Sequence, residues 1–166
     1  MQGRVAKPYP VAGREHSSRP RESPYPGGGF VFPRTGRPTT DRDWEIDPEA
    51  LTRLLVRLKD AYGAPPIYIT ENGAMADDVV EDGAIHDAAR QRFIEQHLHA
   101  TLDAMEQGVE VNGYFVWSLM DNFEWSYGYA HRFGIVHVDF ATQVRTPKDS
   151  ALWFSELVVQ NRLPVA

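Results

Sequence analysis

The heptapeptide Ile67-Tyr68-Ile69-Thr70-Glu71-Asn72-Gly73 has the composition of a short, buried β-strand that runs into a turn. β-Branched and aromatic residues are enriched in strands, and an Asn-Gly pair is a turn signal. Glu71 stands at the C-terminal end of this predicted strand, which is where α/β barrels build their active sites. It is therefore a candidate catalytic residue. Taken alone, a glutamate in this position more often caps a loop or forms a salt bridge, because the barrel rule concerns location and not role.

A helix is predicted on each side of this strand. Upstream, Asp47 is a candidate N-cap, Pro48 occupies the first helical position, and Gly63 ends the helix. Apolar residues in this segment follow the helical period: Leu51, Leu54, Leu55 and Leu58. Downstream, after a polar loop, Asp87 is a candidate N-cap of a second helix that continues to Gly108.

Residues 112–119 form the second predicted strand, and both of its faces are apolar, as is typical of a parallel strand covered by helices. Apolar and polar residues alternate loosely over residues 133–140, which predicts a short hairpin. Thr146-Pro147 is expected to open a last helix. The order helix, strand, helix, strand, helix indicates an α/β fold with a parallel sheet. Two strands are too few for a closed barrel, which needs roughly 250 residues, so we expect part of a βα barrel.

The first 47 residues differ in composition from the rest of the chain. They hold 7 of the 12 prolines and 6 of the 13 glycines, with Pro24-Tyr25-Pro26-Gly27-Gly28-Gly29 at the centre. Proline and glycine interrupt regular structure, and this segment shows no sustained apolar period. We therefore expect a poorly ordered Pro/Gly-rich tail or loop over residues 1–36 and a folded α/β region over residues 37–166.

The overall composition excludes several classes of protein. Hydrophobic residues make up 42% of the chain and charged residues 24%, which is typical of a soluble globular protein. The formal net charge of -6 disfavours a nucleic-acid partner, whose phosphates require Lys and Arg. Residues 1–10 lack the apolar stretch of a signal peptide, and no apolar run approaches the ~20 residues of a membrane span. We therefore expect a cytoplasmic protein without a membrane partner.

A second segment with chemical potential follows the second predicted strand: Trp117-Ser118-Leu119-Met120-Asp121-Asn122-Phe123-Glu124-Trp125. An indole can stack on the C–H face of a pyranose, while carboxylates accept hydrogen bonds from its hydroxyls. This mixture of indoles and carboxylates is suited to binding a sugar. A core aromatic cluster with surface acids is the alternative, and it stays open for Trp117 more than for Glu124 and Trp125, which follow the strand in a loop.

The two segments, together with Arg132-Phe133-Gly134-Ile135-Val136, resemble the family 1 glycoside hydrolases, the β-glucosidase family. Arg37-Pro38-Thr39-Thr40 and Trp44-Glu45-Ile46-Asp47-Pro48 extend this resemblance, which covers about residues 37–164. The resemblance implies a (β/α)8 TIM barrel, of which this chain is the C-terminal part with about the last two strands. It also implies retaining hydrolysis of β-D-glycosides, without a metal or cofactor.

In the same family pattern, Glu71 is the nucleophile, and Trp117, Glu124 and Trp125 bind the sugar, with Phe133 at the border of the pocket. Read locally, Glu71 and Glu124 would be the two catalytic carboxylates. The resemblance argues against this pairing, because the family's general acid lies in an Asn-Glu-Pro segment. No Asn-Glu-Pro occurs in these 166 residues.

We therefore expect a chain that supplies the nucleophile and part of the sugar pocket, with a complementary N-terminal chain as a partner that supplies the acid. The alternative is a catalytically inactive fragment, or a sugar-binding or interaction module. The preference among glucosides, galactosides and phosphorylated glycosides stays open, as does the aglycone.

Other candidate sites receive little support. His97 and His99 are two residues apart on a predicted helix, face different directions and are expected to be solvated. Gly27-Gly28-Gly29 lacks the following Lys-Ser/Thr of a phosphate-binding loop. An acidic segment fits no EF-hand spacing and is expected to be a solvated loop; its members are Asp77, Asp78, Glu81, Asp82 and Asp87.

Overall fold

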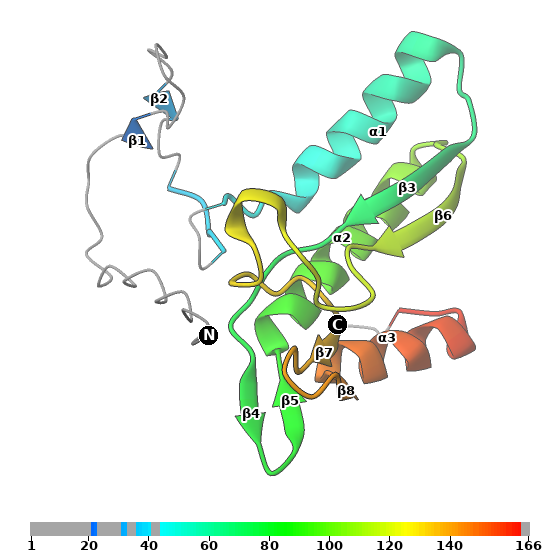
Figure 1. Ribbon diagram of the computed structural model, residues 1–166. Coiled ribbons are helices and arrows are strands. Elements are labelled where there is room, and N and C mark those ends of the chain that lie inside the picture. Colours follow the sequence, from blue (N-terminus) through cyan, green and yellow to red (C-terminus); the bar gives the residue numbers. More distant parts are fainter. Residues whose placement is uncertain (1–20, 23–30, 33–35, 41–43, 164–166) are drawn as a thin grey trace. The chain divides into compact units, whose positions relative to one another are not determined.

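The computed structural model describes residues 21–22, 31–32, 36–40 and 44–163 (Figure 1). The chain divides into two compact units, Met1–Gly36 and Arg37–Ala166. In the first unit, strands β1 (Arg21–Glu22) and β2 (Val31–Phe32) form an antiparallel pair. Apart from these strands and Gly36, the tail predicted over residues 1–36 lies outside the described residues.

The second unit contains the α/β region. Its elements, in chain order, are α1 (Pro48–Tyr62), β3 (Ile67–Asn72), β4 (Val79–Glu81), β5 (Ala84–His86), α2 (Ala88–Glu106), β6 (Val111–Val116), the 3₁₀ turn η1 (Trp125–Tyr127), β7 (Val136–Val138), β8 (Arg145–Pro147) and α3 (Asp149–Gln160). Among the described residues, no helix is long and apolar enough to span a membrane.

Helix α1 has the ends that the sequence predicts. The Asp47 carboxylate accepts a hydrogen bond from Ala50 N at 3.2 Å, which satisfies one of the free amides of the first turn. Pro48 is the first helical residue, and Gly63 ends the helix in the left-handed conformation, with φ at 76°. This conformation is favourable for glycine because it has no Cβ.

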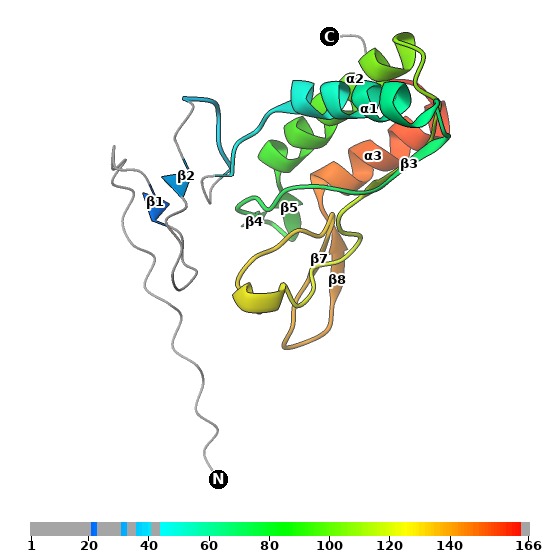
Figure 2. The ribbon, with the colours of Figure 1, turned by 90° about the horizontal axis from the view of Figure 1, so that it is seen from above.

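Strands β3 and β6 form a parallel pair, with Ile67 opposite Val111 and Asn72 opposite Val116. Helices α1 and α2 lie side by side over one face of this pair (Figures 1 and 2). The core between the helices and the strands is apolar and consists of Leu55, Ile69, Ala104 and Val109. Burial of these side chains holds the βαβ unit together.

The opposite face of the β3–β6 pair is open, which differs from the prediction of strands covered on both faces. Tyr68 and Phe115 on this face are 58% and 56% exposed. Within the described part of the chain, β3 and β6 pair only with each other, so each also has an open edge. The apolar residues predicted to be buried on both sides of the sheet therefore lack a second layer here.

The C-terminal hairpin is longer than predicted, and the last helix begins later. Strand β7 pairs with β8, so that Thr146 and Pro147 belong to a strand and do not open the helix. Lys148 N donates to Ile135 O at 2.9 Å, which extends the pairing by one residue. Helix α3 begins at Asp149 because the preceding backbone is still bound to the hairpin.

Candidate functional site

Glu71 lies at the C-terminal end of β3, on the side of the sheet where β6 also ends, and its side chain is exposed. The next residue connects the two strands. Tyr114 Oη donates to Asn72 Oδ1 at 2.7 Å, and Trp117 N donates to Asn72 O at 3.0 Å. Burial raises the pKa of Tyr114, so its hydroxyl keeps the proton that it donates. The backbone beside Glu71 is therefore held against the start of the segment that follows β6.

Gly73 allows this close approach. A Cβ at this position would lie 1.7 Å from Trp117 O, which is far inside van der Waals contact. The peptide bond between Trp117 and Ser118 is cis. Only glycine at position 73 lets the segments after β3 and β6 pass this close to each other.

The structure brings Trp117 and Glu124 together. Trp117 Nε1 donates to Glu124 Oε1 at 3.3 Å, and Glu124 is buried with 7% of its surface exposed. The hydrogen bonds from Glu124 N to Gly128 O and from Tyr127 N to Glu124 O close the turn around this residue. An indole and a carboxylate are thus held as one unit, with an aromatic face and a hydrogen-bond acceptor.

The other two aromatic candidates lie differently. Trp125, the first residue of η1, is 83% exposed. Phe133 is buried, and its ring centroid lies 5.9 Å from that of Trp44. Its carbonyl accepts a hydrogen bond from Ser118 N at 3.2 Å, so Phe133 supports the backbone next to Trp117.

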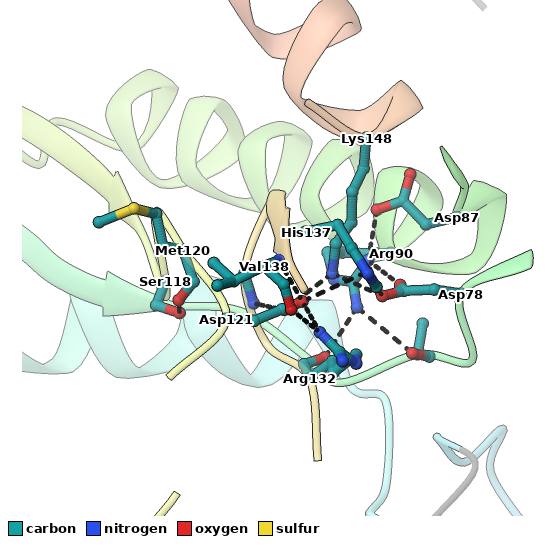
Figure 3. A network of polar contacts seen from close by, with 12 residues as sticks. Asp78, Asp87, Arg90, Ser118, Met120, Asp121, Arg132, His137, Val138 and Lys148 are labelled. Atoms are coloured by element: carbon teal, nitrogen blue, oxygen red, sulfur yellow. Dashed lines mark hydrogen bonds and ion pairs between the residues drawn. The ribbon is translucent and has the colours of Figure 1, made fainter. Parts of the chain in front are cut away.

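A cluster of charged side chains, most of them buried, connects four parts of the chain (Figure 3). We call it the charge cluster; its members are Asp78, Asp87, Arg90, Asp121, Arg132, His137 and Lys148. The predicted solvated acidic loop is wrong for Asp78 and Asp87, whose side chains are 4% and 0% exposed. Asp77, Glu81 and Asp82 are exposed, as predicted. Burial of the two aspartates is compensated by Arg90 and Lys148, because a buried carboxylate requires a partner of opposite charge.

Asp121 fixes the course of the segment between Trp117 and Glu124. Its carboxylate accepts hydrogen bonds from Gly134 N at 3.1 Å, Val138 N at 3.3 Å and Lys148 Nζ at 2.9 Å, and from Arg132 Nη1. Burial by itself would raise the pKa of Asp121, but the hydrogen bonds and charges of Lys148 and Arg132 hold this pKa below its usual range. The carboxylate is therefore ionised at neutral pH.

Asp87 occupies the N-cap position of α2, as predicted, but its carboxylate makes no capping bond to that helix. It accepts instead from Ser150 N at 2.8 Å and Ser150 Oγ at 2.6 Å, at the start of α3. It also pairs with Arg90, three residues further along α2. Asp87 thus joins the two helices.

Asp78, Asp121 and His137 bring atoms of the kind that bind divalent cations within 4.8 Å of one another. Lys148 already lies between the two carboxylates, with Nζ 2.8 Å from Asp78 Oδ2 and 2.9 Å from Asp121 Oδ1. Its ammonium supplies the positive charge that a cation would bring. The absence of a metal site in this protein remains a prediction.

His97 is buried, and the prediction of a solvated side chain is wrong. Its ring stacks on that of Phe93 with the centroids 4.0 Å apart, and its Nδ1 lies 2.8 Å from Phe93 O. Burial lowers the pKa of His97, although the hydrogen bond to Phe93 O opposes the shift. The imidazole therefore packs as a neutral ring in the apolar side of α2.

Comparison with known proteins identifies the family. A model of glycosyl hydrolase family 1 matches residues 15–163. The chain belongs to this family. The motifs that carry the resemblance begin at residue 37, but the family match begins at residue 15. The similarity therefore extends into residues 1–36, which were predicted to be a tail or loop.

Curated proteins similar to this chain are named for different glycosidase activities. β-Glucosidase A of Thermotoga maritima is 50% identical over 127 residues, which are 76% of this chain and 28% of that protein. 6-Phospho-β-galactosidase 1 of Streptococcus pneumoniae is 48% identical over 134 residues, which are 78% of this chain and 28% of that protein. The chain spans less than a third of the length of these curated relatives.

Solved structures of family 1 agree with the fold described above. The family 1 β-glucosidase from Thermotoga maritima aligns with a TM-score of 0.78 at 46% identity, over 82% of this chain and 31% of that one. The same enzyme in complex with glucoimidazole aligns with a TM-score of 0.77 at 47% identity, over 81% of this chain and 30% of that one. The α/β unit of this chain therefore has the fold of about 30% of these family 1 structures.

Arg90 and Lys148, which hold these segments together, were not predicted from the sequence. Charged residues in the first turn of a helix, or just before one, usually face solvent, so their composition carries no sign of burial. One local signal of this ion pair was present: Asp87 and Arg90 are three positions apart, and residues at this spacing are neighbours on a helix.

Proposed function

We propose that this chain supplies the nucleophile and part of the sugar pocket of a retaining β-glycosidase, with Glu71 as the nucleophile. Membership of family 1 supports this role. The position of Glu71 at the end of β3 also supports it, because the next residue, Asn72, is hydrogen-bonded to Trp117 after β6. Trp117, Glu124 and Trp125 are the proposed sugar-binding residues. A β-D-glycoside is the proposed substrate.

In this mechanism Glu71 attacks the anomeric carbon and forms a covalent glycosyl-enzyme, which water then hydrolyses. A second carboxyl group, about 5 to 5.5 Å from the first, protonates the leaving oxygen and later acts as the base. Glu124 is not proposed for this role, because its carboxylate is buried and accepts the Trp117 indole N–H. The general acid is expected from polypeptide outside these 166 residues.

The open sheet supports a partner polypeptide. Both edges of the β3–β6 pair are unpaired among the described residues, and Tyr68 and Phe115 expose an aromatic face. Parallel strands with an uncovered face are rare as an end state, since such sheets are normally buried on both sides. We propose that residues 37–166 are the C-terminal portion of a (β/α)8 barrel, with β3 and β6 as its last two strands, and that the complementary part supplies the other six.

Covalent trapping of the nucleophile tests this function. The chain is co-expressed with the part of Thermotoga maritima β-glucosidase A that precedes its match to this chain, and the complex is treated with a 2-deoxy-2-fluoro-β-glucoside. Peptide mass mapping is expected to place the adduct on Glu71, and Glu71→Gln is expected to abolish it. Glu81→Gln, at an exposed glutamate outside the proposed site, is the matched control and should still be labelled. An adduct on Glu124 or any other residue would refute the assignment.

A sugar-binding module without chemistry is the second candidate. The Trp117–Glu124 pair favours it, since this pair needs no catalytic partner to contact a sugar. Titration of the isolated chain with glucose or glucoimidazole separates the two functions, because a module binds its ligand alone. The absence of binding at millimolar ligand would eliminate this candidate.

A further inference from the structure

Arg90, in the first turn of α2, is completely buried and uses all of its hydrogen-bonding capacity. A guanidinium group has five N–H donors in a planar fork. Each of the three nitrogens of Arg90 is bonded: Nε to Ala74 O at 3.3 Å, Nη1 to Asp78 Oδ1 at 3.0 Å and to Asp87, and Nη2 to Ala76 O at 3.3 Å and to Arg132 O at 2.8 Å. The five acceptors match the five donors.

These acceptors belong to segments that lie far apart along the chain. Ala74, Ala76 and Asp78 follow Glu71 at the end of β3. Arg132 and its neighbour Phe133 bind the segment between Trp117 and Glu124. The Arg132 side chain donates to Asp121, and Phe133 O accepts from Ser118 N. One side chain therefore bonds the segment after the proposed nucleophile and the support of the proposed sugar-binding pair (Figure 3).

We propose that Arg90 is a positioning residue of the glycosidase site, which sets the Trp117–Glu124 pair relative to the segment that follows Glu71. The proposal rests on the proposed function for the sugar-binding role of that pair. Arg90 itself touches no substrate; it acts through the backbone that it binds. Lysine cannot replace it, because an ammonium group is a point charge with three donors and cannot span the same five acceptors.

The indole N–H resonances of the 166-residue chain provide the test. The chain has four tryptophans, so four indole signals are expected in a ¹⁵N–¹H correlation spectrum, and Trp117→Phe assigns one of them. In Arg90→Lys we expect the Trp117 signal to shift or split as its bond to Glu124 is lost. Changes in backbone amides should be confined to residues 74–78 and 117–135. Arg53→Lys on the exposed side of α1 is the matched control, and it should leave the Trp117 signal in place.

Asp78→Asn is the second variant, and it keeps the side-chain volume while it weakens one bond to Arg90. Its expected effect is a smaller shift of the Trp117 signal in the same direction, although Asp78 lies on the other segment. An unchanged Trp117 signal in either folded variant overturns the proposal. Loss of folding in both variants, or shifts spread evenly through α1 and β3, also overturns it, because Arg90 would then hold the fold and not the pair. The readout requires no turnover, so its failure leaves the trapping result for Glu71 intact.

Discussion

Gly73 lies where the chain leaves β3, and its missing side chain allows Trp117 O to come against the backbone. This contact joins the residue after Asn72 to Trp117, the first residue of the proposed sugar-binding segment. The Asn-Gly pair predicted only a turn from sequence. Its second role, as the place where two segments cross, depends on a residue 44 positions later in the chain.

Gly73→Ala is expected to destabilise the chain by about 3 kcal/mol, the upper end of the usual cost of overpacking, because the new Cβ meets a backbone carbonyl that cannot rotate away. Gly63→Ala is the control: that glycine has a positive φ and open space around it, so only the conformational cost of about 1–2 kcal/mol applies. Urea unfolding midpoints measure both effects. An equal or smaller loss in Gly73→Ala would contradict the close approach.

At the scale of elements, α2 combines an apolar side with a buried charged end. Ile94, Ala100 and Ala104 are fully buried along the helix, whereas Arg90 and Asp87 anchor its first turn in the charge cluster. The helix therefore connects the apolar core between the helices and the β3–β6 pair to the charge cluster. His97, on the same helix, is buried, and burial lowers the pKa of its imidazole.

His97 is expected to make the chain less stable as the pH falls below 6.5. Because burial lowers the pKa of His97, the unfolded chain takes up a proton before the folded chain does. Its contribution is therefore complete above the unfolded pKa and is lost as the pH falls toward the folded pKa. Each unit of difference between the two pKa values corresponds to about 1.4 kcal/mol.

Urea unfolding of the wild-type chain and of His97→Phe between pH 7.5 and pH 5 measures this dependence. The stability of wild type relative to the variant should decline with falling pH. The exposed pair of His86 and Asp149, which raises the pKa of His86, acts in the opposite direction and is common to both chains. A constant difference over this pH range would show that His97 is not protonated more readily in the unfolded state.

At the scale of the whole molecule, the chain is a family 1 α/β unit with an open sheet face and less than a third of the length of its relatives. The proposed nucleophile, Glu71, and the proposed sugar-binding pair lie at one end of the sheet. A retaining mechanism needs a general acid. The Asn-Glu-Pro segment that carries this acid in the family pattern does not occur in these 166 residues. Catalysis is therefore a property that we assign to the assembled barrel.

The 166-residue chain alone is expected to hydrolyse an aryl β-glucoside at a negligible rate. Loss of the general acid alone costs about 10²- to 10⁴-fold in rate. Addition of the complementary part of the barrel should restore turnover by at least this factor. Turnover by the isolated chain at an ordinary enzyme rate, if it also disappeared in Glu71→Gln, would show that these residues contain a complete site.

The ends of α1, the order of α1, β3, α2 and β6, and the parallel pairing of β3 with β6 were predictable from the amino acids. Asp47, Pro48 and Gly63 act on neighbouring backbone groups, and the leucine period of α1 acts within one helix. The motifs around Glu71, Trp117 and Glu124 also identified the family. The helix ends and the leucine period are local signals, because the groups that interact lie within a few residues of one another.

The extent of the C-terminal hairpin, the burial of the charges and the burial of His97 could not be predicted in this way. Lys148 reaches Asp121 across 27 residues, and Ser150 reaches Asp87 across 63. A charged side chain can be buried when a residue of opposite charge from another element pairs with it, and local composition does not show whether such a partner is present. Folding of the chain brings these partners together, and it thereby turns a segment with the composition of a solvated acidic loop into the support of the candidate site.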